Sequence, residues 1–231
     1  PMIDRYAVIG NPISHSKSPF IHAEFAKQTK QELHYGTILA PLDGFIEQVN
    51  AFVKLGGRGL NVTLPFKMEA FELATDKSPR ALDAGAVNTL KFVGNSITGD
   101  NSDGIGLVRD ITENLGFAIR GKRVLVIGSG GAARGVIYPL LPEVPLSFTL
   151  VNRSPEKAAG LIARYFEVSF FKPIQLATVT FSELKGQSFD LIINATAASV
   201  SGESLPLPND IFARGSLAYE MEMELSKQEN A

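Results

Sequence analysis

The sequence predicts an α/β protein of two domains, each built on a sheet of mainly parallel strands. Short apolar runs alternate with amphipathic stretches along most of the chain, and a glycine-rich loop directly follows one of the later runs. A hairpin pattern separates an early set of runs from a late set. The length of 231 residues also exceeds the roughly 100–150 residues of a typical single domain, so two modest domains can be accommodated.

Short runs rich in β-branched or apolar residues are typical of buried strands. Because amphipathic, helix-like stretches lie between these runs, the alternation favours βαβ units and therefore parallel sheets. The early runs cover residues 6–9, 37–39 and 60–62, and the late runs cover residues 124–127, 147–151 and 191–193.

The hairpin pattern marks the predicted boundary between the domains. Gly94 and Asn95 lie between two β-prone runs, which is typical of a tight turn between antiparallel strands. We therefore place the boundary near Gly99. The predicted parts are residues 1–100, residues 101–219 and a tail of residues 220–231.

A helix is predicted directly after this boundary. From Gly104 onwards, Ile105, Val108 and Ile111 recur at helical spacing, and the pattern ends before Gly116. Glycine is common just past the C-terminus of a helix. This segment is therefore expected to connect the two halves of the chain.

The composition argues against several classes of partner. A formal net charge of −2 and a pI near 6.0 give no basic excess for nucleic acid. Cysteine is absent and three histidines occur at spacings that match no metal motif, so no metal site is expected. No apolar run approaches the roughly 20 residues of a membrane span, and the start of the chain does not read as a signal peptide. A cytoplasmic location is therefore expected.

The glycine-rich loop at residues 128–133 reads GSGGAA and lies between a buried-strand pattern and a helical run that starts at Arg134. This context favours a dinucleotide site over a plain structural turn. Gly128 would make the tight turn and Gly130 would let the backbone approach a pyrophosphate. Ala133 would allow close packing of helix on strand, and the helix N-terminus would hold the phosphates.

The residues after the next predicted strand indicate NADP rather than NAD. An NAD enzyme places a carboxylate there against the ribose 2′-hydroxyl, whereas this chain has Asn152, Arg153 and Ser154. Arg153 can hold a 2′-phosphate, and its neighbours can donate hydrogen bonds to it. A purely structural alternative also stays open, with Ser154 as the N-cap and Pro155 as the first helical residue.

Polar residues also follow the early strands. Ser16 and Ser18 lie at the entry of a helix marked by Phe20, Ile21, Phe25 and Ala26, where two hydroxyls suit a small carboxylate. Ser18 could instead be a plain N-cap before Pro19. Further along, Asn61 and Thr63 end a strand, and Lys67 opens a helix, an electrostatically unfavourable place for a lysine. These placements indicate a polar site near the ends of the early strands.

Seven short motifs in fixed order complete the pattern, and with them the chain resembles the shikimate dehydrogenase family over nearly its whole length. They are N-P-I-x-H-S-x-S-P from residue 11, N-V-T-x-P-F-K from 61, G-A-V-N-T from 85, G-D-N-x-D-G from 99, G-x-G-G-A-x-R from 128, N-R-S from 152 and I-I-N-A-T from 192.

The resemblance implies an N-terminal α/β substrate domain and a C-terminal Rossmann-like NADP-binding domain that face each other across a cleft. It implies reversible, NADPH-dependent reduction of 3-dehydroshikimate to shikimate, without a metal. Lys67 and Asp103 would form the catalytic pair. Implied substrate residues are Ser16 and Ser18 for the carboxylate, Asn61, Thr63, Asn88 and Asp103 for the ring hydroxyls, and Tyr219. Implied cofactor residues are Gly128, Ser129, Gly130, Gly131, Ala132, Asn152, Arg153, Ser154 and Thr196.

The chain departs from the family pattern at two places. After Thr196 the family usually continues with Ser and a later Gly, whereas this chain has Ala197, Ala198 and Ser199, so one polar group near the nicotinamide is expected to be lost or displaced. After Tyr219 the family's closing loop and helix are missing. A natural truncation and an omitted segment both stay open.

Two alternatives also stay open. The first is a quinate/shikimate dehydrogenase that uses NAD, against which Asn152 and Arg153 argue. The second is a non-catalytic NADP-binding homologue, against which the presence of both Lys67 and Asp103 argues. A homodimer also stays open.

Overall fold

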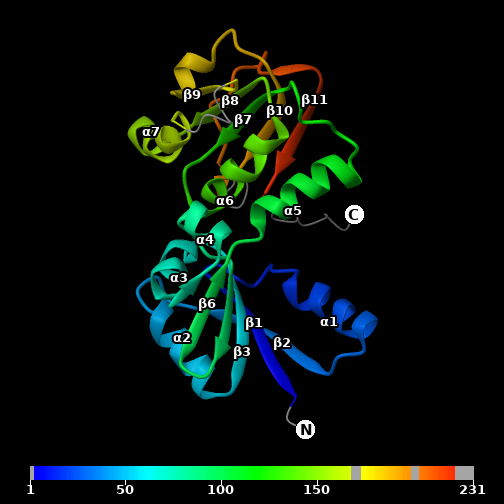
Figure 1. Cartoon of the computed structure of the whole chain (residues 1–231), viewed down its shortest axis with the longest axis vertical. Coiled ribbons are helices and arrows are strands. Elements are labelled where there is room, and N and C mark those ends of the chain that lie inside the picture. The colour runs from blue at the N-terminus through cyan, green and yellow to red at the C-terminus, as the bar shows by residue number, and fades with distance from the viewer. Residues whose placement is uncertain (1–2, 168–172, 199–202, 222–231) are drawn as a thin grey trace, which may run out of the picture. The chain divides into compact units, whose positions relative to one another are not determined.

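The computed structural model describes residues 3–167, 173–198 and 203–221, with the side chain of residue 164 excepted. The chain divides into two compact units, Pro1–Ser102 and Asp103–Ala231 (Figure 1). Both combine helices with a sheet that is wholly or partly parallel, so the α/β prediction is confirmed. The predicted tail lies outside the described residues from position 222 onwards.

The first unit is built on a mixed six-stranded sheet in the order β2-β1-β3-β5-β6-β4. The neighbours β2, β1 and β3 are parallel, whereas β5 runs antiparallel to both β3 and β6. The β5–β6 hairpin turns at Gly94, whose φ of 58° is readily adopted by glycine, and this confirms the predicted hairpin. The strands are β1 (Asp4–Gly10), β2 (Leu33–Leu39), β3 (Gly57–Val62), β4 (Asp76–Lys77), β5 (Thr89–Val93) and β6 (Ser96–Asp100).

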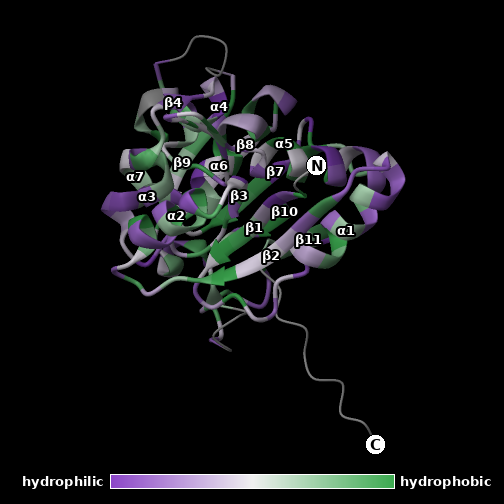
Figure 2. Ribbon diagram, turned by 90° about the horizontal axis from the view of Figure 1, so that it is seen from below, coloured by the Kyte–Doolittle hydropathy of each residue, from purple (hydrophilic) through white to green (hydrophobic). Residues whose placement is uncertain are grey.

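Helices α2, α3 and α4 cover one side of this sheet, and α1 lies beside the edge strand β2 (Figure 1). Phe45 and Val49 of α2 and Phe66 just before α3 are fully buried in the core of this unit. In Figure 2 the helices show hydrophilic and hydrophobic colours side by side, as expected for elements with one buried face. The helices are α1 (Ser18–Thr29), α2 (Phe45–Lys54), α3 (Lys67–Leu73) and α4 (Pro79–Ala84).

Helix α1 forms where it is predicted, but its apolar side chains are not buried by the described residues. Phe20, Ile21 and Phe25 are 69%, 42% and 53% exposed. The helix packs beside an edge strand, which offers little sheet surface to cover an apolar face. The predicted helix is thus confirmed, and its apolar side chains remain largely exposed among the described residues.

The second unit contains a five-stranded, fully parallel sheet in the order β11-β10-β7-β8-β9. Because β8 and β10 lie on opposite sides of β7, the strand order reverses at β7, the place where α/β sheets bind ligands. The strands are β7 (Arg123–Ile127), β8 (Ser147–Val151), β9 (Gln175–Val179), β10 (Phe189–Asn194) and β11 (Phe212–Glu220).

The helices of the second unit include the element predicted from Gly104 to Leu115. It is an α-helix that passes into one π-helical turn before Gly116, whose φ is 62°. Helix α6 begins three residues earlier than predicted, because the small residues Gly131 and Ala132 continue its first turn. Within the described part of this unit, the helices are α5 (Asp103–Arg109), the π turn Asp110–Asn114, α6 (Gly131–Leu140), α7 (Pro155–Ile162) and the 3₁₀ turns Leu141–Glu143, Ala163–Tyr165 and Phe181–Leu184. None of the helices in the described ranges has the length and apolar character needed to cross a bilayer.

A close approach between α5 and α6 gives a test of this packing. A Cβ atom on Gly104 would overlap the backbone oxygen of Gly135, whereas one on Gly106 would meet nothing within 4 Å. We expect Gly104→Ala to lower the free energy of unfolding by about 1–3 kcal/mol, as overpacking does. Gly106→Ala should raise it by about 0.4–1 kcal/mol. Urea unfolding of both variants measures the contrast, and equal effects would contradict the packing.

Candidate active site

The carboxyl end of the first sheet collects the predicted polar residues of the N-terminal half. β1 and β3 run parallel, so the loops that follow them lie at the same edge. Because β5 is antiparallel to β3, its first residue Thr89 is opposite Asn61 near the end of β3. β6 ends beside them, with Asp100 opposite Thr89. Segments far apart in the sequence therefore meet along one edge.

Backbone hydrogen bonds tie these loops together. The N–H of Asn11 donates to the carbonyl of Leu64 over 2.8 Å, and the N–H of Thr63 donates to the carbonyl of Ile9 over 3.0 Å. The side-chain amide of Asn11 donates to the carbonyl of Ala40 over 2.8 Å, which adds the loop after β2. These hydrogen bonds satisfy the backbone groups involved and hold the three loops together.

Ser16 and Ser18 lie where this edge meets α1. Helix α1 begins at Ser18 itself and its N-cap position is Lys17, so the alternative of Ser18 as N-cap is wrong. The physical reason is local: the Ser18 N–H donates to the Ser16 hydroxyl over 3.3 Å, which caps the first turn from one residue further upstream. The Ser16 hydroxyl is consequently held against the backbone at the helix entry.

Lys67 is the first residue of α3, as predicted, and only 8% of it is exposed. Lysine is rarely buried so deeply, which makes the position notable. Its carbonyl accepts a hydrogen bond from the Val87 N–H over 2.8 Å, so its backbone is fixed to the segment that precedes Asn88. Its predicted partner Asp103 begins the second unit, and their pairing stays a prediction.

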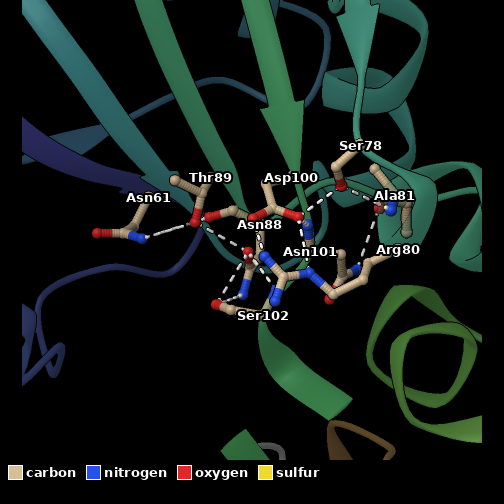
Figure 3. Close-up of polar contacts among 10 residues, drawn as sticks. Asn61, Ser78, Arg80, Ala81, Asn88, Thr89, Asp100, Asn101 and Ser102 are labelled. Atoms are coloured by element: carbon tan, nitrogen blue, oxygen red, sulfur yellow. Dashed lines mark hydrogen bonds and ion pairs between the residues drawn. The ribbon is translucent and has the colours of Figure 1, made fainter. Parts of the chain in front are cut away.

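Asn61, Thr89, Asn88 and Ser102 form a connected hydrogen-bond network (Figure 3). The Asn61 amide donates to the Thr89 hydroxyl over 3.3 Å, and that hydroxyl donates to Oδ1 of Asn88 over 2.9 Å. Oδ1 of Asn88 also accepts from the Ser102 N–H over 3.1 Å. Two predicted substrate residues are thereby linked, and Asn88 holds the peptide that leads directly to Asp103.

Asp100 supports the same edge as a structural ion pair (Figure 3). It accepts two hydrogen bonds from the Arg80 guanidinium, one from the Ser78 hydroxyl over 2.5 Å and one from the Asn101 N–H over 2.8 Å. Burial raises the pKa of Asp100, but the hydrogen bonds from Arg80 and Ser78 outweigh it, so the pKa lies below its usual range. Of the two carboxylates in the segment 99–104, Asp100 therefore stabilises the scaffold.

In the second unit, the glycine loop has the backbone that its motif requires. Gly128 has a φ of 116°, and a Cβ there would lie 3.1 Å from the carbonyl oxygen of Ala195. Gly130 is the N-cap of α6, and a Cβ there would meet nothing within 4 Å. Ala133, in the first turn of α6, is fully buried. The loop therefore has a sharp turn, an open approach and a helix N-terminus.

Three predicted cofactor residues line one cavity of about 310 Å³ in this unit, namely Asn152, Arg153 and Thr196. Arg153 has a partner there, because its Nη2 pairs with Oε2 of Glu203 at 2.5 Å. Both side chains are more than half exposed, so the pair contributes little to stability. No sequence pattern indicated Glu203, which lies 50 positions away.

Asn152 and Ser154 shape the loop around Arg153. The Asn152 amide donates to the Ser154 carbonyl over 3.2 Å. Pro155 is the first residue of α7 and Ser154 is at its N-cap position, as the structural alternative expects, although no side-chain cap from Ser154 occurs among the described contacts. The structural reading of Ser154 is thus only half correct.

The remaining predicted residues also make local contacts. The Thr196 hydroxyl donates to Oδ1 of Asn194 over 2.7 Å and accepts from the Ala198 N–H over 3.2 Å, which closes the turn after β10. The Tyr219 hydroxyl donates to Asp110 over 2.8 Å, and burial, followed by this bond, raises the pKa of Tyr219 to about 12. Ser199, where the family pattern is broken, lies outside the described residues. Across the described part of the chain, no cluster of His, Asp or Glu is arranged to hold a metal ion.

The glycine turn, the open N-terminus of α6 and the adjacent arginine define a dinucleotide-binding α/β protein with a separate polar surface on its first unit. Two family models match the chain, the shikimate dehydrogenase substrate binding domain over residues 8–90 and shikimate / quinate 5-dehydrogenase over residues 109–201. The chain belongs to the shikimate dehydrogenase family.

Individual relatives agree with this assignment. A shikimate dehydrogenase (NADP(+)) from Dechloromonas aromatica (strain RCB) is 58% identical over 220 residues, which are 95% of this chain and 78% of the relative. The solved structure of an Ael1 enzyme from Pseudomonas putida superposes with a TM-score of 0.82 at 47% identity, covering 94% of this chain and 78% of that one. Shikimate 5-dehydrogenase from Thermus thermophilus, in complex with NADP(H) and shikimate, gives a TM-score of 0.79 at 29% identity over 94% and 78% of the two chains.

Proposed function

We propose that this chain catalyses the reversible, NADPH-dependent reduction of 3-dehydroshikimate to shikimate. The observation that carries the proposal is the polar edge of the first sheet, where hydroxyls, amides and a buried lysine gather on interlinked loops. This set matches a small polyhydroxylated carboxylate. The names of the relatives supply the particular substrate, since similar proteins are shikimate dehydrogenases that use NADP.

Residues of the first unit bind the substrate in this proposal. Ser16 and Ser18 donate hydrogen bonds to the carboxylate, and Asn61, Thr63 and Asn88 hold the ring hydroxyls. Neutral donors of this kind orient a substrate without placing a competing charge beside it. Tyr219 and Asp103 of the second unit complete the set, and residues 1–100 and 101–219 serve as substrate and cofactor domains.

Lys67 and Asp103 carry the acid–base chemistry. As the ketone is reduced, its oxygen gains negative charge and must take up a proton. The Lys67 ammonium stabilises that charge and donates the proton, and Asp103 holds the ammonium in place. In the oxidative direction Lys67 takes the proton back from the hydroxyl. A proton donor must be held in a fixed position. This need explains why Lys67 is buried and why its carbonyl accepts a hydrogen bond from the Val87 N–H.

The second unit fits NADP. Gly130 leaves room for a pyrophosphate at the N-terminus of the ten-residue helix α6, and Arg153 can meet the 2′-phosphate from the cavity it lines with Asn152 and Thr196. Bound NADPH supplies the hydride that reduces the ketone carbon. Ser129, Gly131 and Ala132 contribute the remaining turn of the loop around the phosphates.

The proposal is tested by following NADPH formation from shikimate and NADP. We expect turnover with shikimate and NADP, and much weaker turnover when NAD replaces NADP. Faster turnover with NAD and quinate would instead support the quinate/shikimate alternative. Binding of NADP without turnover of either substrate would support the non-catalytic homologue.

Removal of metal ions gives a second prediction. Because the acid–base step is assigned to Lys67 and Asp103, dialysis against a chelator should leave the rate of shikimate oxidation unchanged within about twofold of the undialysed enzyme. The assay compares rates before and after dialysis, and after adding Mg²⁺ or Zn²⁺ back. Loss of activity that a divalent ion restores would contradict a metal-free mechanism.

A further inference from the structure

We propose that Tyr35 and Thr89 are positioning residues that fix the orientation of the Asn61 and Asn88 side-chain amides for substrate binding. This inference rests on the proposed function, because those two amides are its hydroxyl-binding groups. An asparagine amide has two orientations related by a flip of about 180°, which exchange its donor and its acceptor. A site that recognises hydroxyl groups therefore needs something to select one orientation.

The selection starts at a donor whose direction is unambiguous. The backbone N–H of Ser102 can only donate, and it lies 3.1 Å from Oδ1 of Asn88. The Ser102 hydroxyl in turn lies 3.1 Å from the nitrogen of that amide. Because a hydroxyl can donate or accept, the Ser102 N–H is the contact that places the oxygen of Asn88, and the amide nitrogen then lies toward the Ser102 hydroxyl.

Thr89 transmits this orientation to Asn61 (Figure 3). Its hydroxyl lies 2.9 Å from Oδ1 of Asn88 and must donate, because a carbonyl oxygen can only accept. Having one hydrogen, the hydroxyl can only accept from its other neighbour, Nδ2 of Asn61 at 3.3 Å. A single hydroxyl thus makes the orientation of one amide dependent on the other.

Tyr35 completes the selection at the far side of Asn61. Its hydroxyl lies 2.6 Å from Oδ1 of Asn61 and must donate to it. The Tyr35 ring is stacked on His22 with centroids 4.1 Å apart, and the His22 ring is within 2.9 Å of the Ser18 carbonyl, so the phenol is held in place. Burial raises the pKa of Tyr35 to about 12 despite a hydrogen bond with Ser18, so the phenol keeps its proton at any ordinary assay pH.

These groups lie where a small molecule can reach them. Tyr35, Asn61 and Thr89 line one cavity of about 550 Å³ within the first unit, together with Tyr6. Without the Tyr35 and Thr89 hydroxyls, the orientation of Asn61 that presents the wrong group to the substrate would no longer be disfavoured by the loss of these hydrogen bonds. The cost falls on binding of the substrate rather than on proton transfer, which is assigned to Lys67.

Steady-state kinetics of three variants test the proposal. The loss of one hydrogen bond to a positioned amide costs about 1–1.4 kcal/mol of binding free energy, which corresponds to a roughly 5- to 10-fold weaker affinity. We expect Tyr35→Phe and Thr89→Val each to raise the KM for shikimate by about this factor, with kcat within about threefold and the KM for NADP unchanged. Thr89→Ser keeps the hydroxyl and should restore the KM of the wild type.

Matched controls separate positioning from general damage. Tyr6→Phe changes the same cavity, and Thr98→Val changes an exposed residue of β6, so both should keep the KM of the wild type. In an Asn61→Ala background, Tyr35→Phe should raise the KM less than twofold further, because its effect acts through Asn61.

The outcomes distinguish this inference from the proposed function. A wild type that does not oxidise shikimate would defeat the proposed function. An active wild type with an unchanged KM in both Tyr35→Phe and Thr89→Val, or equal effects of Tyr35→Phe with and without Asn61, would overturn the positioning role. If Thr89→Val does not fold, the cycle of Tyr35 and Asn61 decides.

Discussion

Lys67→Ala is expected to lower kcat for shikimate oxidation by at least about 10²-fold, the low end of general acid–base effects, while the KM for shikimate changes only a few-fold. The reason is that Lys67 acts on charge that develops during the reaction, whereas Ser16, Ser18 and Asn88 are assigned to binding. Steady-state kinetics with saturating NADP measure the split between kcat and KM.

Because Lys67 is buried, the effect of removing its ammonium group must be separated from the effect of losing side-chain volume. Lys67→Met keeps most of the volume and removes the ammonium, so it should lose as much activity as Lys67→Ala with less effect on the free energy of unfolding. Lys91→Ala, at an exposed position of β5, should leave kcat unchanged. An unchanged kcat together with a raised KM in both Lys67 variants would make Lys67 a binding residue.

The sequence predicted the central strands well and the edges poorly. The predicted runs in β1, β3, β7, β8 and β10 are strands, because parallel strands buried on both faces leave continuous apolar runs. The strand at residues 37–39 extends back to Leu33, and β4, β9 and β11 were not predicted. These elements lie at sheet edges, where one side is open and the polar residues they carry hide the pattern.

The glycine loop was predictable for a physical reason. A turn with a positive φ at Gly128 and open space at Gly130 permits few residue types, so the local sequence records the requirement directly. The same holds for the Gly94 turn. Such features depend on neighbours in the chain and not on the tertiary fold.

Contacts between distant segments could not be predicted in the same way. The Tyr35 hydroxyl donates to Asn61, 26 positions away, and Arg153 pairs with Glu203, 50 positions away. The sequence around Tyr35 and around Glu203 has no local pattern that distinguishes these residues from ordinary surface residues. The opposite error occurred at Ser18, whose spacing suggested an N-cap. The hydroxyl of Ser16 fulfils that need from a position that spacing rules do not consider.

Arg153→Ala is expected to weaken NADP binding by about 10- to 150-fold and to leave NAD binding nearly unchanged. The range corresponds to charge-assisted hydrogen bonds worth roughly 1.5–3 kcal/mol at 1.4 kcal/mol per tenfold. NAD lacks the 2′-phosphate, so removing the Arg153 guanidinium takes no hydrogen bond away from bound NAD. Binding titrations with both nucleotides measure the ratio. Since the contact is ionic and exposed, the NADP preference of the wild type should also shrink as salt rises.

Glu203 gives this prediction a control of opposite sign. A 2′-phosphate must displace the Glu203 carboxylate from Arg153 or approach a like charge beside it. Removing that carboxylate with Glu203→Gln should therefore tighten NADP binding by about 2- to 5-fold, the equivalent of an exposed ion pair of up to about 1 kcal/mol. NAD binding should not respond. Equal losses of NADP and NAD in Arg153→Ala would mean that the pair with Glu203 shapes the loop, so that Arg153 supports the fold of the cavity instead of selecting the phosphate.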